Sequence, residues 1–179
     1  MSSQCVPGGY GAFAKFRSDI DLIATRSLHF DSAMSSKIVE EVKDAYSKSP
    51  HPSRIKALVM TNPHNPIGGC YSPTILQDLM KFCKTKGLHY ISVEIFAMSA
   101  FGGEEGFTSA LSLVHDGEES PMDPRHVHVI YSMSKDFGSA GLRMVRCCFS
   151  HSTALLSLQY ANFVSYLHVQ PASHASIFK

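Results

Sequence analysis

The sequence contains no tryptophan, no CxxC pair and no apolar run near the roughly 18 residues of a membrane span. Its five cysteines are scattered and odd in number, which argues against a disulfide framework or a structural zinc site. The net charge of +1 offers no electrostatic footprint for nucleic acid or an anionic membrane surface, so neither partner is expected. The N-terminus lacks the basic and apolar regions of a secretory signal. A reducing compartment, the cytoplasm, is therefore the simplest expectation.

What the sequence does contain is enough apolar material for a buried core. The chain has 179 residues, of which 44% are hydrophobic and 17% charged, and this favours one globular domain. The hydrophobic periodicity predicts strands over 55–60, 88–93, 127–131 and 143–149 and long helices over 35–48 and 72–86. Ser72 is the expected N-cap and Gly87 the expected stop of the second helix.

The order strand, loop, helix, glycine, strand between residues 55 and 93 is typical of a parallel crossover unit. We therefore predict an α/β fold of three layers, with a mostly parallel sheet and flanking helices. Less regular patterns predict further elements: a strand within 20–30, a short helix near 109–114, an amphipathic helix over 153–168 and a last helix after Pro171.

Three polar segments follow predicted strands: Asn62–Gly69, Val93–Phe96 and Ser132–Lys135. Open α/β sheets build their ligand sites at the carboxyl ends of strands, so these segments are the candidate site. Taken singly, each also has a structural interpretation. The first can be a rigid turn rich in proline and glycine, and the last a solvated helix start. His126 and His128 share a strand face but lack a third ligand at suitable spacing, so no metal site is predicted.

Taken together, the motifs resemble the fold-type-I, pyridoxal-phosphate-dependent aminotransferases of class I and II. The chain is most similar to the 1-aminocyclopropane-1-carboxylate (ACC) synthase-like branch, and the resemblance covers essentially all 179 residues. It rests on the segments Pro7–Phe13, Asn62–Gly68, Ile91–Phe96 and Tyr131–Arg143.

The resemblance implies a pyridoxal 5'-phosphate site made of Tyr10, Asn65, Ser132, Ser134, Lys135 and Arg143. The cofactor's aldehyde needs an amine, and Lys135 matches the lysine that forms the Schiff base and moves the proton in this family. We expect a buried, cation-rich site to lower the pKa of such a lysine. The two serines and Arg143 match the phosphate ligands, Asn65 the donor to the phenolic oxygen and Tyr10 the ring that stacks on the cofactor.

Two positions depart from the family pattern. Val93 stands where the family has an aspartate that keeps the pyridine nitrogen protonated, and Phe96 stands where it has a tyrosine. Glu94 is adjacent, but side chains alternate along a strand, so we expect it on the opposite face. Loss of one partner of a buried ion pair costs about 3–5 kcal/mol, although here the ring nitrogen can deprotonate and recover part of that. An unprotonated ring also stabilises a carbanion poorly.

Family members are much longer than this chain. The resemblance implies that residues 1–179 form a single partial domain, the central portion of the large domain, without the small domain. No arginine follows Arg146, so the family's C-terminal arginine for the substrate carboxylate has no counterpart. We expect uncovered apolar surface and therefore association, as a homo-oligomer or with a full-length relative.

Three functional hypotheses follow. The first is a pyridoxal-phosphate-dependent aminotransferase or ACC synthase-like enzyme acting on an α-amino acid in small-metabolite biosynthesis. The second is a truncated, inactive paralogue that acts only as an interaction partner or is a non-functional fragment. The third, a generic nucleotide-binding module, ranks last because neither GxGxxG nor GxxxxGK[ST] occurs. Val93, Phe96 and the missing arginine favour the second hypothesis for the activity of this chain alone.

Overall fold

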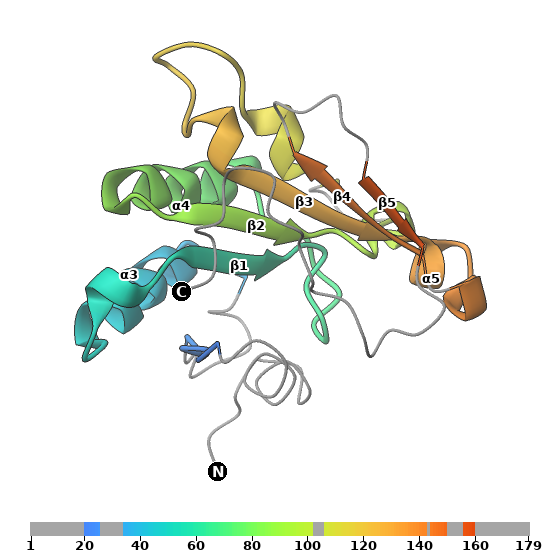
Figure 1. The fold of residues 1–179 in the computed structure, drawn as a ribbon, viewed down its shortest axis with the longest axis horizontal. Helices are drawn as coiled ribbons and strands as arrows, with labels where there is room; N and C mark the ends of the chain where they lie inside the picture. Colours follow the sequence, from blue (N-terminus) through green and yellow to red (C-terminus); the bar gives the residue numbers. More distant parts are fainter. Residues whose placement is uncertain (1–19, 26–33, 102–105, 143, 150–155, 160–179) are drawn as a thin grey trace.

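The protein is built on one five-stranded sheet in the order β1-β2-β3-β4-β5 (Figure 1). The computed structural model describes residues 20–25, 34–101, 106–142, 144–149 and 156–159. The first three strands pair in parallel, while β4 runs antiparallel to both of its neighbours, so four of the five strands point the same way. The mostly parallel α/β fold is thus confirmed. The strands are β1 (Ala57–Thr61), β2 (His89–Val93), β3 (Val127–Ser132), β4 (Met144–Phe149) and β5 (Leu156–Gln159).

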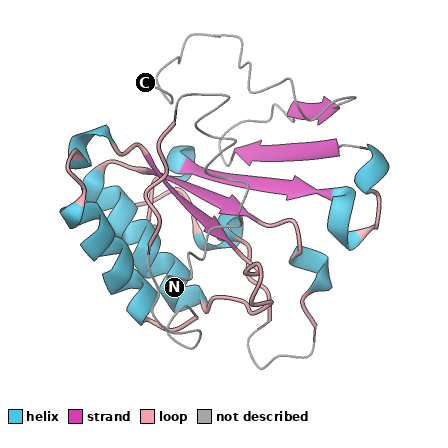
Figure 2. Cartoon of the chain, turned by 90° about the horizontal axis from the view of Figure 1, so that it is seen from below, coloured by secondary structure: helices cyan, strands magenta, loops and turns pink. Residues whose placement is uncertain are grey.

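The two long helices, α3 (Lys37–Lys48) and α4 (Pro73–Lys86), lie together on one side of the sheet (Figure 2). The predicted ends of α4 are confirmed. The Ser72 side chain accepts a hydrogen bond from the Ile75 amide, and Gly87 ends the helix with a left-handed φ of 65°. The remaining elements are short: η1 (Pro52–Arg54), η2 (Ala97–Ser99), the predicted η3 (Ala110–Leu113), η4 (Pro124–His126), α5 (Met133–Asp136) and η5 (Ala140–Leu142).

The core lies between these helices and alternate residues of the strands. In register, Leu58, Tyr90 and Val127 form one row across β1 to β3, and Tyr90 and Val127 are fully buried. The side chains at the alternate strand positions face away from α3 and α4. One of them, Val59, keeps 48% of its surface exposed. In the part of the chain that the structure describes, no long helix covers this second face, so two of the three predicted layers are seen. On this second face Val59 is exposed whereas Val93 is buried, so the predicted exposed apolar face is seen only in part among the described residues.

Two sequence-based expectations fail within the described residues. The amphipathic helix predicted over 153–168 is wrong at residues 156–159, where β5 pairs antiparallel with β4. Residues 20–25 form no regular structure, and so the strand expected within 20–30 is absent there. The first error has a physical reason. Hydrophobic periodicity over so few residues does not distinguish a helix from a strand, and here the pairing with β4 satisfies the backbone hydrogen bonds. The rest of both ranges, and the helix after Pro171, lie outside the described residues.

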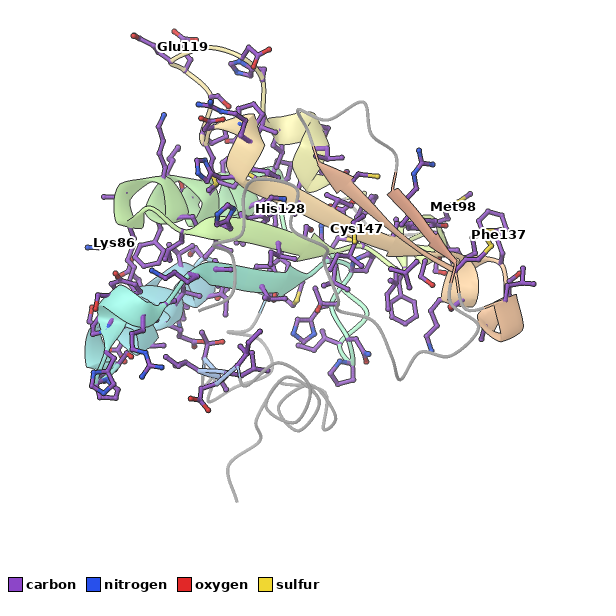
Figure 3. The ribbon with its side chains drawn as sticks, viewed as in Figure 1. Lys86, Met98, Glu119, His128, Phe137 and Cys147 are labelled. Carbon is purple, nitrogen blue, oxygen red and sulfur yellow. The ribbon has the colours of Figure 1, made fainter. Side chains whose placement is uncertain are left out.

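Three imidazoles meet at the end of β2 and β3 that is remote from the carboxyl termini of these strands: His89 in β2, His126 in η4 and His128 in β3. His89 Nδ1 and His128 Nε2 lie 2.8 Å apart, and the ring centroids of His89 and His126 are 4.8 Å apart. Burial, aided by His89 and His126, lowers the pKa of His128 to about 4. Figure 3 labels this side chain on the sheet. Among the described residues, no three histidine, cysteine, aspartate or glutamate side chains are placed to hold a metal ion together.

Acid should therefore destabilise the protein through His128. In the unfolded chain this imidazole takes a proton near its ordinary pKa of 6.5, whereas in the folded chain it stays neutral down to about 4. Stability contributed by the neutral ring is present above pH 6.5 and is lost as the pH falls through that window, by no more than about 3 kcal/mol, because solvent screening reduces the full effect. Urea unfolding at several pH values measures it. His128→Phe should flatten this slope, while His51→Phe, at an exposed histidine, should leave it unchanged. Equal slopes in both variants would contradict the prediction.

The described residues include no helix that combines the length and the apolar character needed to cross a membrane.

Candidate active site

The three polar segments singled out in the sequence meet at one edge of the sheet. Because β1, β2 and β3 are parallel neighbours, the loops after them leave from the same side. Hydrogen bonds join these loops directly to the adjacent strand ends. The Asn62 amide donates to the Val93 carbonyl at 3.0 Å, and the Glu94 amide donates to the Ile130 carbonyl at 2.8 Å. The predicted convergence of the segments is confirmed.

The loop after β1 is held by a buried asparagine. Asn62 is fully buried; its side chain accepts from the Tyr71 amide at 3.0 Å and donates to the Thr108 carbonyl at 3.1 Å. The loop then closes on itself, with the His64 amide 2.8 Å from the Gly69 carbonyl, and Gly68 has a φ of 82° that favours glycine. This anchoring leaves Asn65 partly exposed on the loop. Sequence reasoning missed Asn62, although an amide directly after a buried strand was a usable signal.

The turn after β3 carries the candidate lysine. Ser132 is buried, and its hydroxyl accepts from the Ser134 amide at 3.1 Å while lying 2.7 Å from the Ser134 hydroxyl and 3.0 Å from the Met144 carbonyl. These contacts form the first turn of α5 and put two hydroxyls directly before Lys135. The Lys135 Nζ lies 5.8 Å from the centroid of the Phe96 ring.

Lys135 is exposed, and the expectation of a buried site around it is wrong for the described residues. The physical reason is its position. The turn follows the carboxyl end of β3 at the edge of the sheet, and among the described side chains the Phe96 ring is the one aromatic group recorded near the amine. The sequence motif predicts where Lys135 lies in the fold. The burial of its side chain depends on which other segments pack around it.

Glu94 does not replace the missing aspartate. Its carboxylate is buried against the helix side, where Oε2 accepts from the Ser109 hydroxyl at 2.7 Å and Oε1 from the Ala110 amide at 2.8 Å. Burial raises the pKa of Glu94, and hydrogen bonds from Ala110, Ser109 and Ser92 oppose that rise. The predicted orientation away from the Val93 face is confirmed. Sequence reasoning missed that Glu94 anchors the 106–113 segment to the end of β2.

The residues at this edge fit one part of the implied cofactor and not another. The hydroxyls of Ser132 and Ser134 suit a phosphate, and the exposed amine of Lys135 suits an aldehyde. Val93 is buried and apolar, and it offers no partner to a pyridine nitrogen. Tyr10 and Arg143 lie outside the described residues, so their predicted roles stay predictions, as does the proximity of Lys135 to Asn65.

Comparison with known proteins identifies the class. The family described as aminotransferase class I and II matches residues 25–176, and the chain belongs to this family. Among its relatives is the protein named "Probable aminotransferase sirI" of Leptosphaeria maculans, 39% identical over 165 residues, which cover 85% of this chain and 39% of that protein. Another is 1-aminocyclopropane-1-carboxylate synthase 7 of Arabidopsis thaliana, 32% identical over 138 residues, which cover 76% of this chain and 30% of that protein.

The fold comparison agrees with the sequence. An aspartate aminotransferase from Rhodobacter sphaeroides superposes with a TM-score of 0.51 at 19% identity, covering 63% of this chain and 26% of the other. At this identity the likeness establishes the fold alone. The chain spans less than two-fifths of the length of the curated relatives it matches.

Proposed function

We propose that this protein is a pyridoxal-phosphate-dependent, ACC synthase-like aminotransferase acting on an α-amino acid in small-metabolite biosynthesis. The observation that carries the proposal is the meeting of the Asn62–Gly69 loop, the end of β2 and the Ser132–Lys135 turn at one sheet edge. The curated relatives support the biosynthetic setting, since one is named a trimodular acetylaranotin synthesis protein of Aspergillus terreus. We place the reaction in the cytoplasm, which suits the free thiols of Cys70, Cys83, Cys147 and Cys148.

Each residue of the implied cofactor site has a task in this proposal. When bound, the cofactor supplies an aldehyde for amino groups and an electron-withdrawing ring. Ser132 and Ser134 would bind its phosphate, with Arg143 as the cation. Lys135 would hold the aldehyde end through its amine and carry a proton at Nζ. Asn65 would donate to the phenolic oxygen, and Tyr10 would stack on the ring.

The direct test is whether the chain acquires a visible absorbance band with pyridoxal 5'-phosphate. We expect a band that Lys135→Ala abolishes, because the band requires the ring-edge amine. Lys81→Ala removes an exposed lysine that pairs with Asp78 on α4, and it should leave the band unchanged. A chain that stays colourless with added cofactor, or a band that survives Lys135→Ala, would falsify the proposal.

A second candidate function is that of an interaction partner without turnover. Two observations favour it: Val93 stands buried where the ring nitrogen needs a charge, and large apolar side chains are exposed around the same edge. The exposed set is Met98, Phe101, Phe137 and Leu142, with Phe101 at 92% exposure. Exposed apolar surface of this kind marks interfaces in soluble proteins. The partner would be a second copy of the chain or a full-length relative.

Association is therefore expected for the purified chain. Size-exclusion chromatography with light scattering should give a mass above that of the 19.6 kDa monomer. Phe101→Ser and Met98→Ser together should shift the mass towards the monomer, because they remove the most exposed apolar groups. Val114→Ser, at a partly buried position packed against the core, is the control that should not act through association. A monodisperse wild-type monomer that melts cooperatively would contradict this prediction.

A further inference from the structure

Asp136, the residue directly after the candidate lysine, joins the two loops of the site. One carboxylate oxygen accepts from the Met98 amide at 2.9 Å, and the other accepts from the Ser99 hydroxyl at 2.6 Å. The Tyr131 hydroxyl donates to the same carboxylate at 3.1 Å. Two of the three donors come from η2, just beyond β2, and the third comes from the end of β3. One carboxylate thus fastens the loop after β2 to the turn after β3.

This junction determines what lies beside the lysine. η2 follows Phe96 immediately, and α5 contains both Lys135 and Asp136. With η2 held by Asp136, the Phe96 ring lies 5.8 Å from the Lys135 Nζ, within the range of a cation–π contact. Phe96 lacks a hydroxyl, so it cannot be oriented by a hydrogen bond of its own. Its placement depends on the backbone of the loop to which it belongs.

Hydrogen bonds to a charged acceptor are strong enough for this task. Each is stronger than a bond between neutral groups. Both carboxylate oxygens of Asp136 accept from neutral donors of the two loops, so this carboxylate serves the loop junction. Met98 and Phe137 flank the junction at the same end of the sheet (Figure 3).

We propose that Asp136 is a positioning residue, whose carboxylate holds η2 against α5 and thereby keeps the Phe96 ring beside the amine of Lys135. The contact itself is a property of the chain. Its use in orienting the amine for a cofactor aldehyde rests on the proposed function.

The contact can be measured without any cofactor. Reductive methylation with a ¹³C label keeps the charge of each lysine and makes its methyl groups visible by NMR. The Lys135 resonance is assigned by its absence in Lys135→Arg. We expect it upfield of the other lysines because of the Phe96 ring current, and at the ordinary position in Phe96→Leu. In Asp136→Ala it should move to the Phe96→Leu position, and in Ser99→Ala it should move part of the way.

Hydrogen exchange gives a second readout. Loss of the carboxylate should accelerate exchange of the Met98 amide on the order of tenfold or more, since one bond to a charged acceptor is removed. Ser112→Ala removes an exposed hydroxyl that donates to the Ser109 carbonyl, away from the junction, and should change neither readout. A Lys135 resonance that keeps its wild-type position in Asp136→Ala would overturn the proposal. If Asp136→Ala does not fold, Ser99→Ala replaces it. A Lys135 resonance that stays at its wild-type position in Ser99→Ala would then overturn the proposal.

Adding pyridoxal 5'-phosphate separates this proposal from the proposed function. If the wild type shows no cofactor band while the resonance pattern holds, the proposed function fails and the role of Asp136 towards Lys135 stands. If the band forms, Asp136→Asn should change its pH titration and weaken cofactor binding on the order of tenfold. A band with unchanged titration and affinity in that variant would overturn a role of Asp136 at the cofactor site.

Discussion

Val93→Asp is expected to destabilise the cofactor-free chain and to make it depend on pyridoxal 5'-phosphate for stability. Val93 is buried at 5% exposure, and a carboxylate there would have no described partner charge. An unpaired buried charge costs about 3–5 kcal/mol, so the melting temperature should fall clearly. Added cofactor should then raise it more than in the wild type, because the new carboxylate pairs with the pyridine nitrogen and ligand binding stabilises the folded state.

The matched control for this experiment is Ile91→Asp. Ile91 precedes Val93 by two residues on β2, so both side chains project from the same face of the strand. Ile91→Asp should destabilise the chain and show no added response to the cofactor, because it lies further from the carboxyl end of the strand. Melting curves with and without pyridoxal 5'-phosphate give the comparison. Equal responses of the two variants would mean that position 93 does not face the ring nitrogen.

Glu94→Ala is expected to lower the free energy of unfolding by about 3 kcal/mol, from the lost hydrogen bonds and the space left behind. The carboxylate is buried and receives bonds from the Ser109 hydroxyl and the Ala110 amide. Without it, both donors are left unpaired in the interior, and the 106–113 segment loses its attachment to the end of β2. Urea unfolding at neutral pH measures the loss. A cost below about 1 kcal/mol would show that water replaces the carboxylate.

Glu94→Gln tests the charge separately from the hydrogen bonds. Burial raises the pKa of Glu94 in the folded state, so folding disfavours the ionised form. Stability due to Glu94 should accordingly fall as the pH rises through its folded-state pKa. Glu94→Gln carries no such charge and has no such loss. The difference in free energy of unfolding between wild type and Glu94→Gln should therefore shrink from acid to neutral pH. If this difference in free energy of unfolding grew with pH, the pKa of Glu94 would be lowered by folding and not raised.

The elements predicted best were those whose signals are local and redundant. In α4, a serine cap, a proline in the first turn, an apolar stripe and a terminal glycine all agreed, and each is a short-range preference. The strands β1, β2 and β3 were predicted equally well, since each is a short run rich in apolar residues and bounded by turn signals. The failure at β5 has the opposite cause, because a four-residue strand takes its stability from its partner β4.

Much of the candidate site could also be anticipated. The order of motifs placed Asn65, Ser132, Ser134 and Lys135 after strands, and parallel pairing brought these strand ends to one edge. The hydrogen-bond partners of Asn62, Glu94 and Asp136 could not be anticipated, because they are distant along the chain. Asn62, for example, donates to Thr108, which lies 46 residues away.

The amino-acid sequence by itself determined the family, the succession of strands and helices, and the positions at which this chain departs from its relatives. These depend on residue identity and local periodicity, and both are present in the linear order of the residues. Only the tertiary structure decided that Glu94 binds Ser109 and Ala110, that Asp136 joins two loops and that Lys135 is exposed. Burial and hydrogen bonding are properties of the surroundings, and the surroundings exist only once distant segments have packed together.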